Sequence, residues 1–252
     1  MASLLKVSDV SRSFGNLHAL DGVTLSVDEG SVTILIGPNG SGKTTLINVI
    51  TGFQKPDGGR IFYHENDITG WSPQRVYKTG IARTFQIPSM FGKLSTLENL
   101  LVADRNHPGE SLTISLLKRL WARHEREATE KASKILELLG LAEQADKPAS
   151  LLSGGQMKLV ELGRALMSDA KLYLLDEPVS GVNPTLAHEI FGRIIGLREQ
   201  YGITFFIIEH RLEIALKYVD YVNAMASGKL IAAGSPKEVI SDPKVIEAYL
   251  GG

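Results

Sequence analysis

The chain has 252 residues, of which 43% are hydrophobic and 22% charged, a composition typical of a globular protein. Its 27 Lys and Arg nearly balance its 28 Asp and Glu, so the net charge of -1 gives no general electrostatic case for binding nucleic acid. The absence of cysteine excludes disulfides, thiolate catalysis and Cys-ligated metals. The amino-terminal stretch does not have the pattern of a secretory signal, and the longest apolar runs have only strand length. Any association with a membrane is therefore expected to come through a partner.

The first sixty residues predict several short strands with the sequences LLKVSDV, LDGVTLSV and IFYH, the last after the turn KPDGGR. Within this region, SVTILI at 31–36 is a continuous apolar run, as expected of a buried parallel strand. A glycine-rich segment follows, and then TTLINVITG, which predicts a helix with Gly52 at its carboxyl-terminal cap.

The glycine-rich segment GPNGSGKTT, residues 37–45, matches the pattern G-x-x-x-x-G-K-[ST] between a strand and a helix. Such a loop directs successive backbone N–H groups at phosphate oxygens, and the helix start adds about half a positive charge. Lys43 is expected to reach the β and γ phosphates, and the Thr44 hydroxyl to bind Mg²⁺. The alternative is a glycine-rich turn with an exposed lysine. The residues expected to bind nucleotide are Gly37, Pro38, Asn39, Gly40, Ser41, Gly42, Lys43, Thr44 and Thr45.

The middle of the chain, about 88–168, contains helical patterns and no convincing strand. In its long charged segment, Ala128, Ala132, Ile135 and Leu139 fall on one helical face. We therefore expect a helical subdomain inserted into the remainder of the chain.

The last third of the chain alternates strands and helices. Two further buried strands are predicted at 171–176 (KLYLLD) and 203–208 (ITFFII). Between them a helix is predicted at 184–202, with Pro184 in its first turn and Gly202 past its end. The tail has two helix starts, Ser235-Pro236 and Asp242-Pro243. This alternation favours a parallel α/β sheet.

Two carboxylates, Asp176 and Glu177, stand at the end of the apolar strand LYLLD. In an open parallel sheet, ligands bind beyond the carboxyl ends of the strands, where the phosphate loop also lies. Asp176 is expected to hold the metal directly or through water, and Glu177 to orient or deprotonate the water that attacks the γ-phosphate. The alternative is a pair of solvated acids that begin a turn before Pro178.

The sequence LSGGQ, residues 152–156, lies between the phosphate loop and the acidic strand end. Ser153 is placed to cap a helix, and the two glycines allow an anion to approach its start closely. Taken alone, the segment is equally well explained as a capped helix after a loop. Together with the phosphate loop and Asp176–Glu177, in this order, it closely resembles the signature of ATP-binding cassette (ABC) ATPases. The resemblance covers essentially the whole chain.

This resemblance implies an α/β fold of the P-loop NTPase class. It consists of a RecA-like parallel-sheet core, an N-terminal antiparallel β subdomain and an inserted helical subdomain. The expected single domain spans 1–252, with the ATP-binding core in 1–87 and 169–252 and the helical signature subdomain in 88–168.

In the ABC family two subunits pack head to tail, with ATP between the phosphate loop of one and the signature of the other. The resemblance thus implies that Ser153, Gly154, Gly155 and Gln156 bind nucleotide in trans. Phe14, in SRSFG, resembles the aromatic residue that stacks on adenine, and a buried strand-end Phe is the alternative.

Two more positions match the family. Gln86, in IARTFQ, resembles the glutamine that contacts Mg²⁺ or the water, and His210, in FFIIEH, resembles the switch histidine at the γ-phosphate. The expected catalytic residues are Glu177, His210, Gln86 and Lys43, and the expected metal ligands are Thr44, Gln86 and Asp176. Two positions depart from the family pattern, because Asn183 and Arg211 stand where Asp is common. The resemblance therefore gives no expectation for the contacts that the loop at 180–184 makes across the subunit interface.

Longer phrases, including IARTFQIP, LSGGQMKLVELGRALM and SDPKVIEAYLG, resemble the branched-chain amino-acid importer ATPases. The resemblance implies ATP and Mg²⁺ as cofactors and a second ABC ATPase subunit, identical or paralogous. It further implies permease subunits, an indirect solute-binding protein, no nucleic acid, and a peripheral location on the cytoplasmic face of the inner membrane. Two alternatives are an ABC ATPase of a lipid or lipoprotein export or extraction complex, and a non-transport dimerisation switch driven by ATP.

Overall fold

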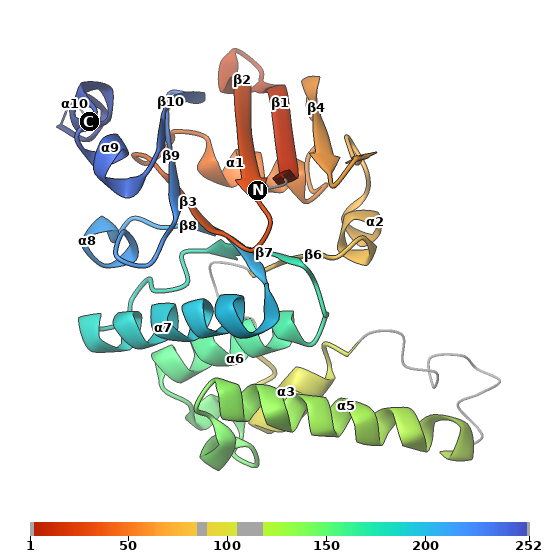
Figure 1. Cartoon of the computed structure of the whole chain (residues 1–252). Coiled ribbons are helices and arrows are strands. Elements are labelled where there is room, and N and C mark those ends of the chain that lie inside the picture. Colours follow the sequence, from red (N-terminus) through yellow and green to blue (C-terminus); the bar gives the residue numbers. More distant parts are fainter. Residues whose placement is uncertain (1–2, 85–89, 105–117, 251–252) are drawn as a thin grey trace. The chain divides into compact units, whose positions relative to one another are not determined.

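The computed structural model describes residues 3–84, 90–104 and 118–250, apart from the side chains of 118–120 and 250. The contacts divide the chain into two compact units (Figure 1). The first consists of Met1–Arg83 and Ala170–Gly252, and the second of Thr84–Asp169. The sequence analysis places these boundaries at 87/88 and 168/169.

A six-stranded sheet in the order β10-β9-β3-β8-β7-β6 forms the centre of the first unit. Its strands are β3 (Val32–Ile36), β6 (Ile81–Arg83), β7 (Leu172–Asp176), β8 (Thr204–Ile208), β9 (Tyr221–Ala226) and β10 (Lys229–Gly234). All of its neighbouring pairs are parallel except β9 with β10. Every residue of β3, β7 and β8 is buried, which is why these three strands are continuous apolar runs in the sequence. The three buried strands predicted from the sequence are confirmed.

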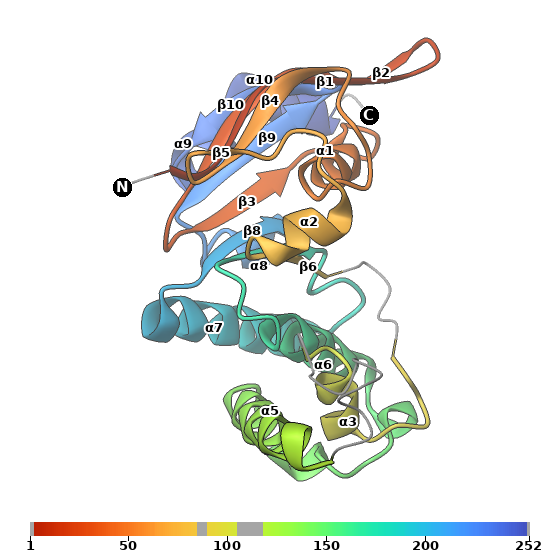
Figure 2. The same ribbon diagram turned by 90° about the vertical axis from the view of Figure 1, so that its right-hand side faces the viewer.

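A second, antiparallel sheet in the order β2-β1-β4-β5 belongs to the same unit. Its strands are β1 (Ser3–Phe14), β2 (Leu17–Asp28), β4 (Gly58–Tyr63) and β5 (Asn66–Asp67). Helix α1 (Lys43–Ile50; Figure 2) contributes apolar side chains to a core shared with both sheets. The phosphate loop therefore joins a buried strand to a helix that is packed on both sides.

The remaining helices of this unit are α2 (Pro73–Lys78), α7 (Pro184–Tyr201), α8 (Leu212–Ala215), α9 (Pro236–Ile240) and α10 (Pro243–Leu250). Pro184 begins α7, and Gly202 caps its end in the left-handed conformation, as predicted. Ser235 caps α9 through a capping box with Glu238. Local cap residues thus account for where α7 begins and ends and for where α9 begins.

The second unit is helical in its described part. It contains α3 (Thr96–Leu101), α5 (Lys118–Leu138), α6 (Gly154–Leu166) and the short 3-10 turns η2 (Ala142–Gln144) and η3 (Ala149–Leu151). The predicted apolar face of α5 is buried, with Ala132 and Leu139 both 0% exposed. Gly163 of α6 allows close packing, since a Cβ there would lie 3.0 Å from a methyl of Leu139. None of the helices in the described part of the chain has the length and apolar character needed to cross a membrane.

Candidate functional site

Two glycines of the phosphate loop have backbone conformations and surroundings that only glycine fits. Gly37 has φ 151°, and a Cβ there would lie 2.2 Å from the carbonyl oxygen of Met225. Gly42, immediately before α1, has φ 101°, and its Cβ would lie 2.4 Å from the carbonyl oxygen of Ala19. The loop is therefore pressed against β9 at one end and β2 at the other.

Lys43 begins α1 and is turned back into the loop. Its Nζ donates to the carbonyl oxygens of Gly37 (2.8 Å) and Pro38 (2.9 Å) and to the Ser41 hydroxyl (3.2 Å). Burial lowers the pKa of the Lys43 ammonium, while the negative charges of Glu177 and Asp176 oppose this shift. The loop and the acidic strand end are therefore close enough to interact electrostatically, as parallel strands with adjacent carboxyl ends require.

The rest of the loop presents polar groups outward. Asn39, Gly40 and Thr44 are exposed, whereas Ser41 is buried. One contact comes from the far end of the chain, because the hydroxyl of Tyr249 in α10 lies close to the backbone of Gly37. Burial raises the pKa of this tyrosine, and its contact with the backbone of Gly37 opposes the shift. Helix α10 thus touches the phosphate loop, a contact that the sequence analysis did not anticipate.

Asp176 ends β7 and is held by an arginine that the sequence analysis missed. Arg83, the last residue of β6, donates to Asp176 Oδ2 at 3.0 Å, and both side chains are less than one-tenth exposed. The same guanidinium donates to Asn48 Oδ1 of α1 at 2.6 Å. Arg83 therefore ties the metal-binding candidate to the helix that follows the phosphate loop.

The Arg83–Asp176 pair leads to a prediction about stability. Arg83→Met should lower the free energy of unfolding by about 3–5 kcal/mol, because it removes the buried cation that hydrogen-bonds to the buried Asp176 carboxylate. The double variant Arg83→Met/Asp176→Leu should lose less, since both charges are then removed. Arg12→Met, which breaks the partly exposed pair with Asp57, should cost far less, because solvent screens the pair. Denaturant unfolding of the wild type and the three variants measures these free energies. Equal losses of unfolding free energy in Arg83→Met and Arg12→Met would contradict the prediction.

Glu177 and His210 lie together in the structure. Glu177 follows β7 with φ 51°, a left-handed conformation that is costly for a residue with a side chain and is common at functional sites. Its Oε1 lies 3.2 Å from Nε2 of His210, which follows β8. The histidine side chain is 35% exposed and the glutamate 17%, so the pair is open to solvent on one side.

Phe14 lies at the end of β1 and is 42% exposed, which disfavours the alternative of a buried strand-end residue. The guanidinium of Arg12 lies 5.0 Å from the centre of its ring. An aromatic ring exposed at the hairpin between β1 and β2 offers apolar surface on which a planar base can stack.

In the second unit, Ser153 caps α6 as predicted. Its Oγ accepts from the backbone N–H of Gln156, whose side chain in turn accepts from the N–H of Ser153. The Gln156 side chain is thus occupied in a capping box, a local role that the sequence analysis did not assign.

Gly154 opens α6 in a position where nothing among the described residues requires glycine. A Cβ built there meets no atom within 4 Å, and the residue is exposed. Alanine is more favourable than glycine in a helix by about 1 kcal/mol. The backbone at this helix start is therefore accessible from outside the described part of the chain.

Gln86, expected at the metal and the water, lies outside the described residues.

The two departures from the family pattern both have structural roles. Asn183 caps α7 by accepting from the N–H of Leu186 at 2.9 Å. Arg211 donates to the carbonyl oxygen of Val182 at 2.7 Å and so joins the loop after β8 to the loop after β7.

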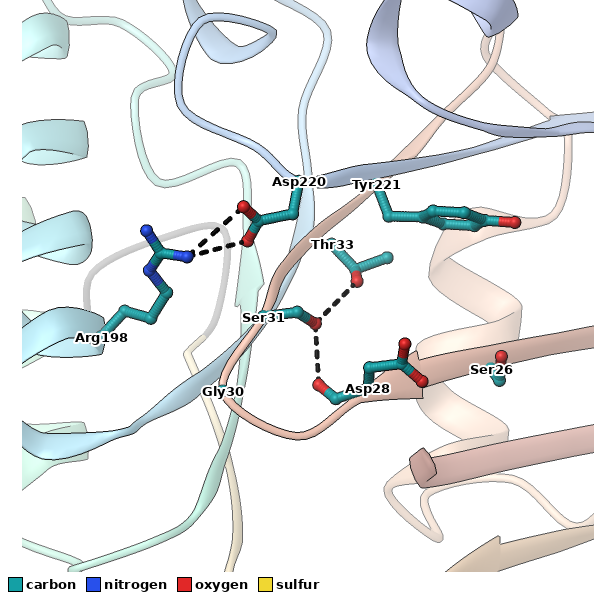
Figure 3. A pocket seen from close by; sticks show the side chains of 8 residues that line it. All are labelled: Ser26, Asp28, Gly30, Ser31, Thr33, Arg198, Asp220 and Tyr221. Carbon is teal, nitrogen blue, oxygen red and sulfur yellow. Dashed lines mark hydrogen bonds and ion pairs between the residues drawn. The ribbon is translucent and has the colours of Figure 1, made fainter. Parts of the chain in front are cut away.

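A pocket of about 340 Å³ lies elsewhere in the first unit (Figure 3). Its lining includes Ser31 and Asp220, at the amino ends of β3 and β9, and Arg198, which pairs with Asp220 at 3.3 Å. The phosphate loop follows the carboxyl end of β3, at the opposite edge of the sheet. This pocket is therefore not part of the phosphate site.

The oxygen ligands at the carboxyl ends of the parallel strands are compatible with Mg²⁺. A threonine hydroxyl and an aspartate carboxylate are oxygen ligands, and Mg²⁺ in nucleotide sites takes one or two carboxylates together with phosphates and water. Among the described residues there is no cluster of three or more His, Asp or Glu side chains that could hold a metal unaided.

A buried parallel sheet, a glycine loop leading into a helix, and an acidic strand end beside it define a P-loop nucleoside triphosphatase. The family model described as ABC transporter matches residues 20–180. A second model, described as branched-chain amino acid ATP-binding cassette transporter, matches residues 229–252. The chain belongs to the ABC transporter family and is one of its ATP-hydrolysing, nucleotide-binding subunits.

Individual relatives are similar over nearly the whole chain. A probable branched-chain amino acid transport ATP-binding protein LivG of Methanocaldococcus jannaschii is 51% identical, over 98% of this chain and 97% of its own. The high-affinity branched-chain amino acid transport ATP-binding protein BraF of Pseudomonas aeruginosa is 37% identical, over 98% of each chain. The crystal structure of the ADP conformation of an ABC transporter cassette has a TM-score of 0.88 and 50% identity, covering 100% of both chains. The predicted fold is thereby confirmed.

Proposed function

We propose that this chain hydrolyses ATP for a membrane importer of branched-chain, hydrophobic amino acids. The observation that carries this proposal is the similarity over nearly the full length, at 51% and 37% identity, to two proteins named for that transport. The match of the carboxyl-terminal region to a model described for the same transporters supports it independently of the shared ATPase motifs.

At the phosphates, Lys43 would exchange its bonds to the loop carbonyls for bonds to the β and γ phosphates. Thr44 and Asp176 would hold Mg²⁺, and Gln86 would contact the metal or the attacking water. When bound, Mg²⁺ neutralises charge that develops on the phosphate oxygens. Phe14 would stack on adenine.

Glu177 would orient the attacking water and accept its proton. Two observations support this role. Glu177 interacts electrostatically with Lys43, the lysine of the phosphate loop, and its Oε1 lies 3.2 Å from Nε2 of His210. His210 would donate to the γ-phosphate and report its loss after hydrolysis.

Ser153, Gly154, Gly155 and Gln156 would bind the γ-phosphate of ATP held by a second subunit. The exposed position of Gly154 supports this in-trans role, because the start of the helix is open to another chain. The helix start would supply backbone N–H groups and a favourable dipole to the anion.

The partners follow from this arrangement. The second subunit is an identical or paralogous ABC ATPase, and permease subunits would contact the helical subdomain, residues 88–168, of the single ATPase domain. A solute-binding protein would act through the permease. The chain would then be peripheral, on the cytoplasmic face of the inner membrane.

The test is reconstitution of the full chain with a permease and a solute-binding protein encoded beside it. We expect ATP turnover to rise when the binding protein is loaded with leucine, isoleucine or valine, and to stay basal when glutamate is supplied. A matched complex with Lys43→Ala should show neither basal nor stimulated turnover. Stimulation by lipid or lipoprotein but not by these amino acids would contradict the proposal, as would stimulation by no substrate at all.

A further inference from the structure

A buried carboxylate, Glu209, connects the two loops that carry Glu177 and His210. It follows β8, precedes His210 directly, and is 1% exposed. The sequence analysis assigns it no role. A carboxylate in such a place is costly unless its oxygens are satisfied.

Three backbone N–H groups satisfy it. Oε1 accepts from Val179 at 2.9 Å, in the loop after β7. Oε2 accepts from its own neighbours His210 at 2.9 Å and Arg211 at 3.2 Å. The two oxygens thus bind different loops, Oε1 the loop after β7 and Oε2 the loop after β8.

The bonds around Glu209 keep the same two loops in register. The N–H of Glu177 donates to the carbonyl oxygen of Ile208 at 2.9 Å, and Arg211 reaches the carbonyl oxygen of Val182. Between these connections lies the 3.2 Å contact of Glu177 with His210. Glu177 also has the left-handed backbone, which the surrounding structure must hold in place.

We infer that Glu209 is a positioning residue for ATP hydrolysis, acting through the backbone to fix the separation of Glu177 and His210. It does not itself touch the phosphates. The inference rests on the proposed roles of Glu177 and His210 and adds the element that sets their geometry. Misplacement of reacting groups by about 1 Å can cost about 100-fold in rate.

Glu209→Gln tests this, because an amide keeps one oxygen and replaces the other by NH₂, which cannot accept from a backbone N–H. We expect turnover to fall by about 10–100-fold with the ATP dissociation constant unchanged. Glu209→Asp, which keeps the charge and both acceptors on a shorter side chain, should recover part of the loss.

Thr204→Val is the matched control. Thr204 is also buried in β8 and also accepts from a backbone N–H, that of Gly30 at 2.9 Å, but at the opposite end of the strand. It should lower the unfolding temperature and leave turnover near the wild-type rate. Equal loss of turnover in Thr204→Val and Glu209→Gln would show that general destabilisation is the cause, and would overturn the inference.

A double-variant cycle separates positioning from an independent effect. In a Glu177→Gln background, single-turnover hydrolysis should fall by less than about twofold when Glu209→Gln is added, because the group being positioned is already inactive. If the rate loss of the double variant equals the product of the rate losses of the two single variants, the inference is overturned. Wild-type turnover in Glu209→Gln would overturn it as well. Unimpaired turnover in Glu177→Gln alone would instead refute the proposed function.

Discussion

Glu177→Gln should lower ATP turnover by about 100-fold or more while ATP still binds with nearly its original affinity. The amide has almost the same shape as the carboxylate but cannot accept a proton from the attacking water. Because binding is retained and hydrolysis is blocked, the subunits should accumulate as a closed dimer with ATP. Phosphate release, calorimetric titration with ATP and light scattering measure these three quantities.

The control for this variant is Glu189→Gln. Glu189 lies on α7 with its side chain 49% exposed, where it pairs with Arg193 at 3.6 Å. Its loss should change neither turnover nor dimer formation. Turnover in Glu177→Gln within a few-fold of the wild type would mean that another group accepts the proton, and the assigned role would then be abandoned.

Gly154→Asp should reduce hydrolysis by at least about 100-fold without weakening ATP binding to the monomer. A carboxylate at this helix start would oppose the γ-phosphate, and juxtaposed like charges cost several kcal/mol, with each 1.36 kcal/mol worth tenfold in rate. The fold should tolerate the change, since a Cβ at this position meets nothing within 4 Å. Measurements are nucleotide binding at concentrations below dimer formation and turnover above it.

Gly192→Asp provides the matched control for Gly154→Asp, because Gly192 also lies in a helix with open space around its Cβ. It should leave turnover unchanged. A dimer of one Gly154→Asp chain and one Lys43→Ala chain has two sites. One of them combines the intact phosphate loop of the first chain with the intact signature of the second, so part of the turnover should return. Loss of monomer binding in Gly154→Asp to the same degree as turnover would contradict the in-trans account.

The parts of the fold that the sequence could predict are those whose causes are local. The apolar runs that became β3, β7 and β8 are buried on every residue, so their character does not depend on knowing their neighbours. The caps at Pro184 and Gly202 likewise act within one turn of α7. The strands β6, β9 and β10 were missed. β6 has only three residues, and β10 has mostly half-buried ones, so neither carries a clear periodic pattern.

The same distinction holds for the site. The phosphate loop and the Ser153 cap are contiguous motifs and could be recognised directly. Arg83 is 93 residues from Asp176 and 35 from Asn48, so only the folded chain reveals what it binds. Glu209 offered one sequence signal, a charged residue that directly continues the apolar run FFII, but its acceptor role toward Val179 depends on the pairing of β7 with β8.

The contact between Tyr249 and Gly37 makes α10 a convenient place for an optical reporter. The chain contains no cysteine, so a single one introduced at Ile246, which is 45% exposed on α10, would carry a fluorophore without any other substitution. The label would stand within one helical turn of a side chain that touches the phosphate loop. For the same reason an affinity tag is better fused to the amino end, where it leaves this contact undisturbed.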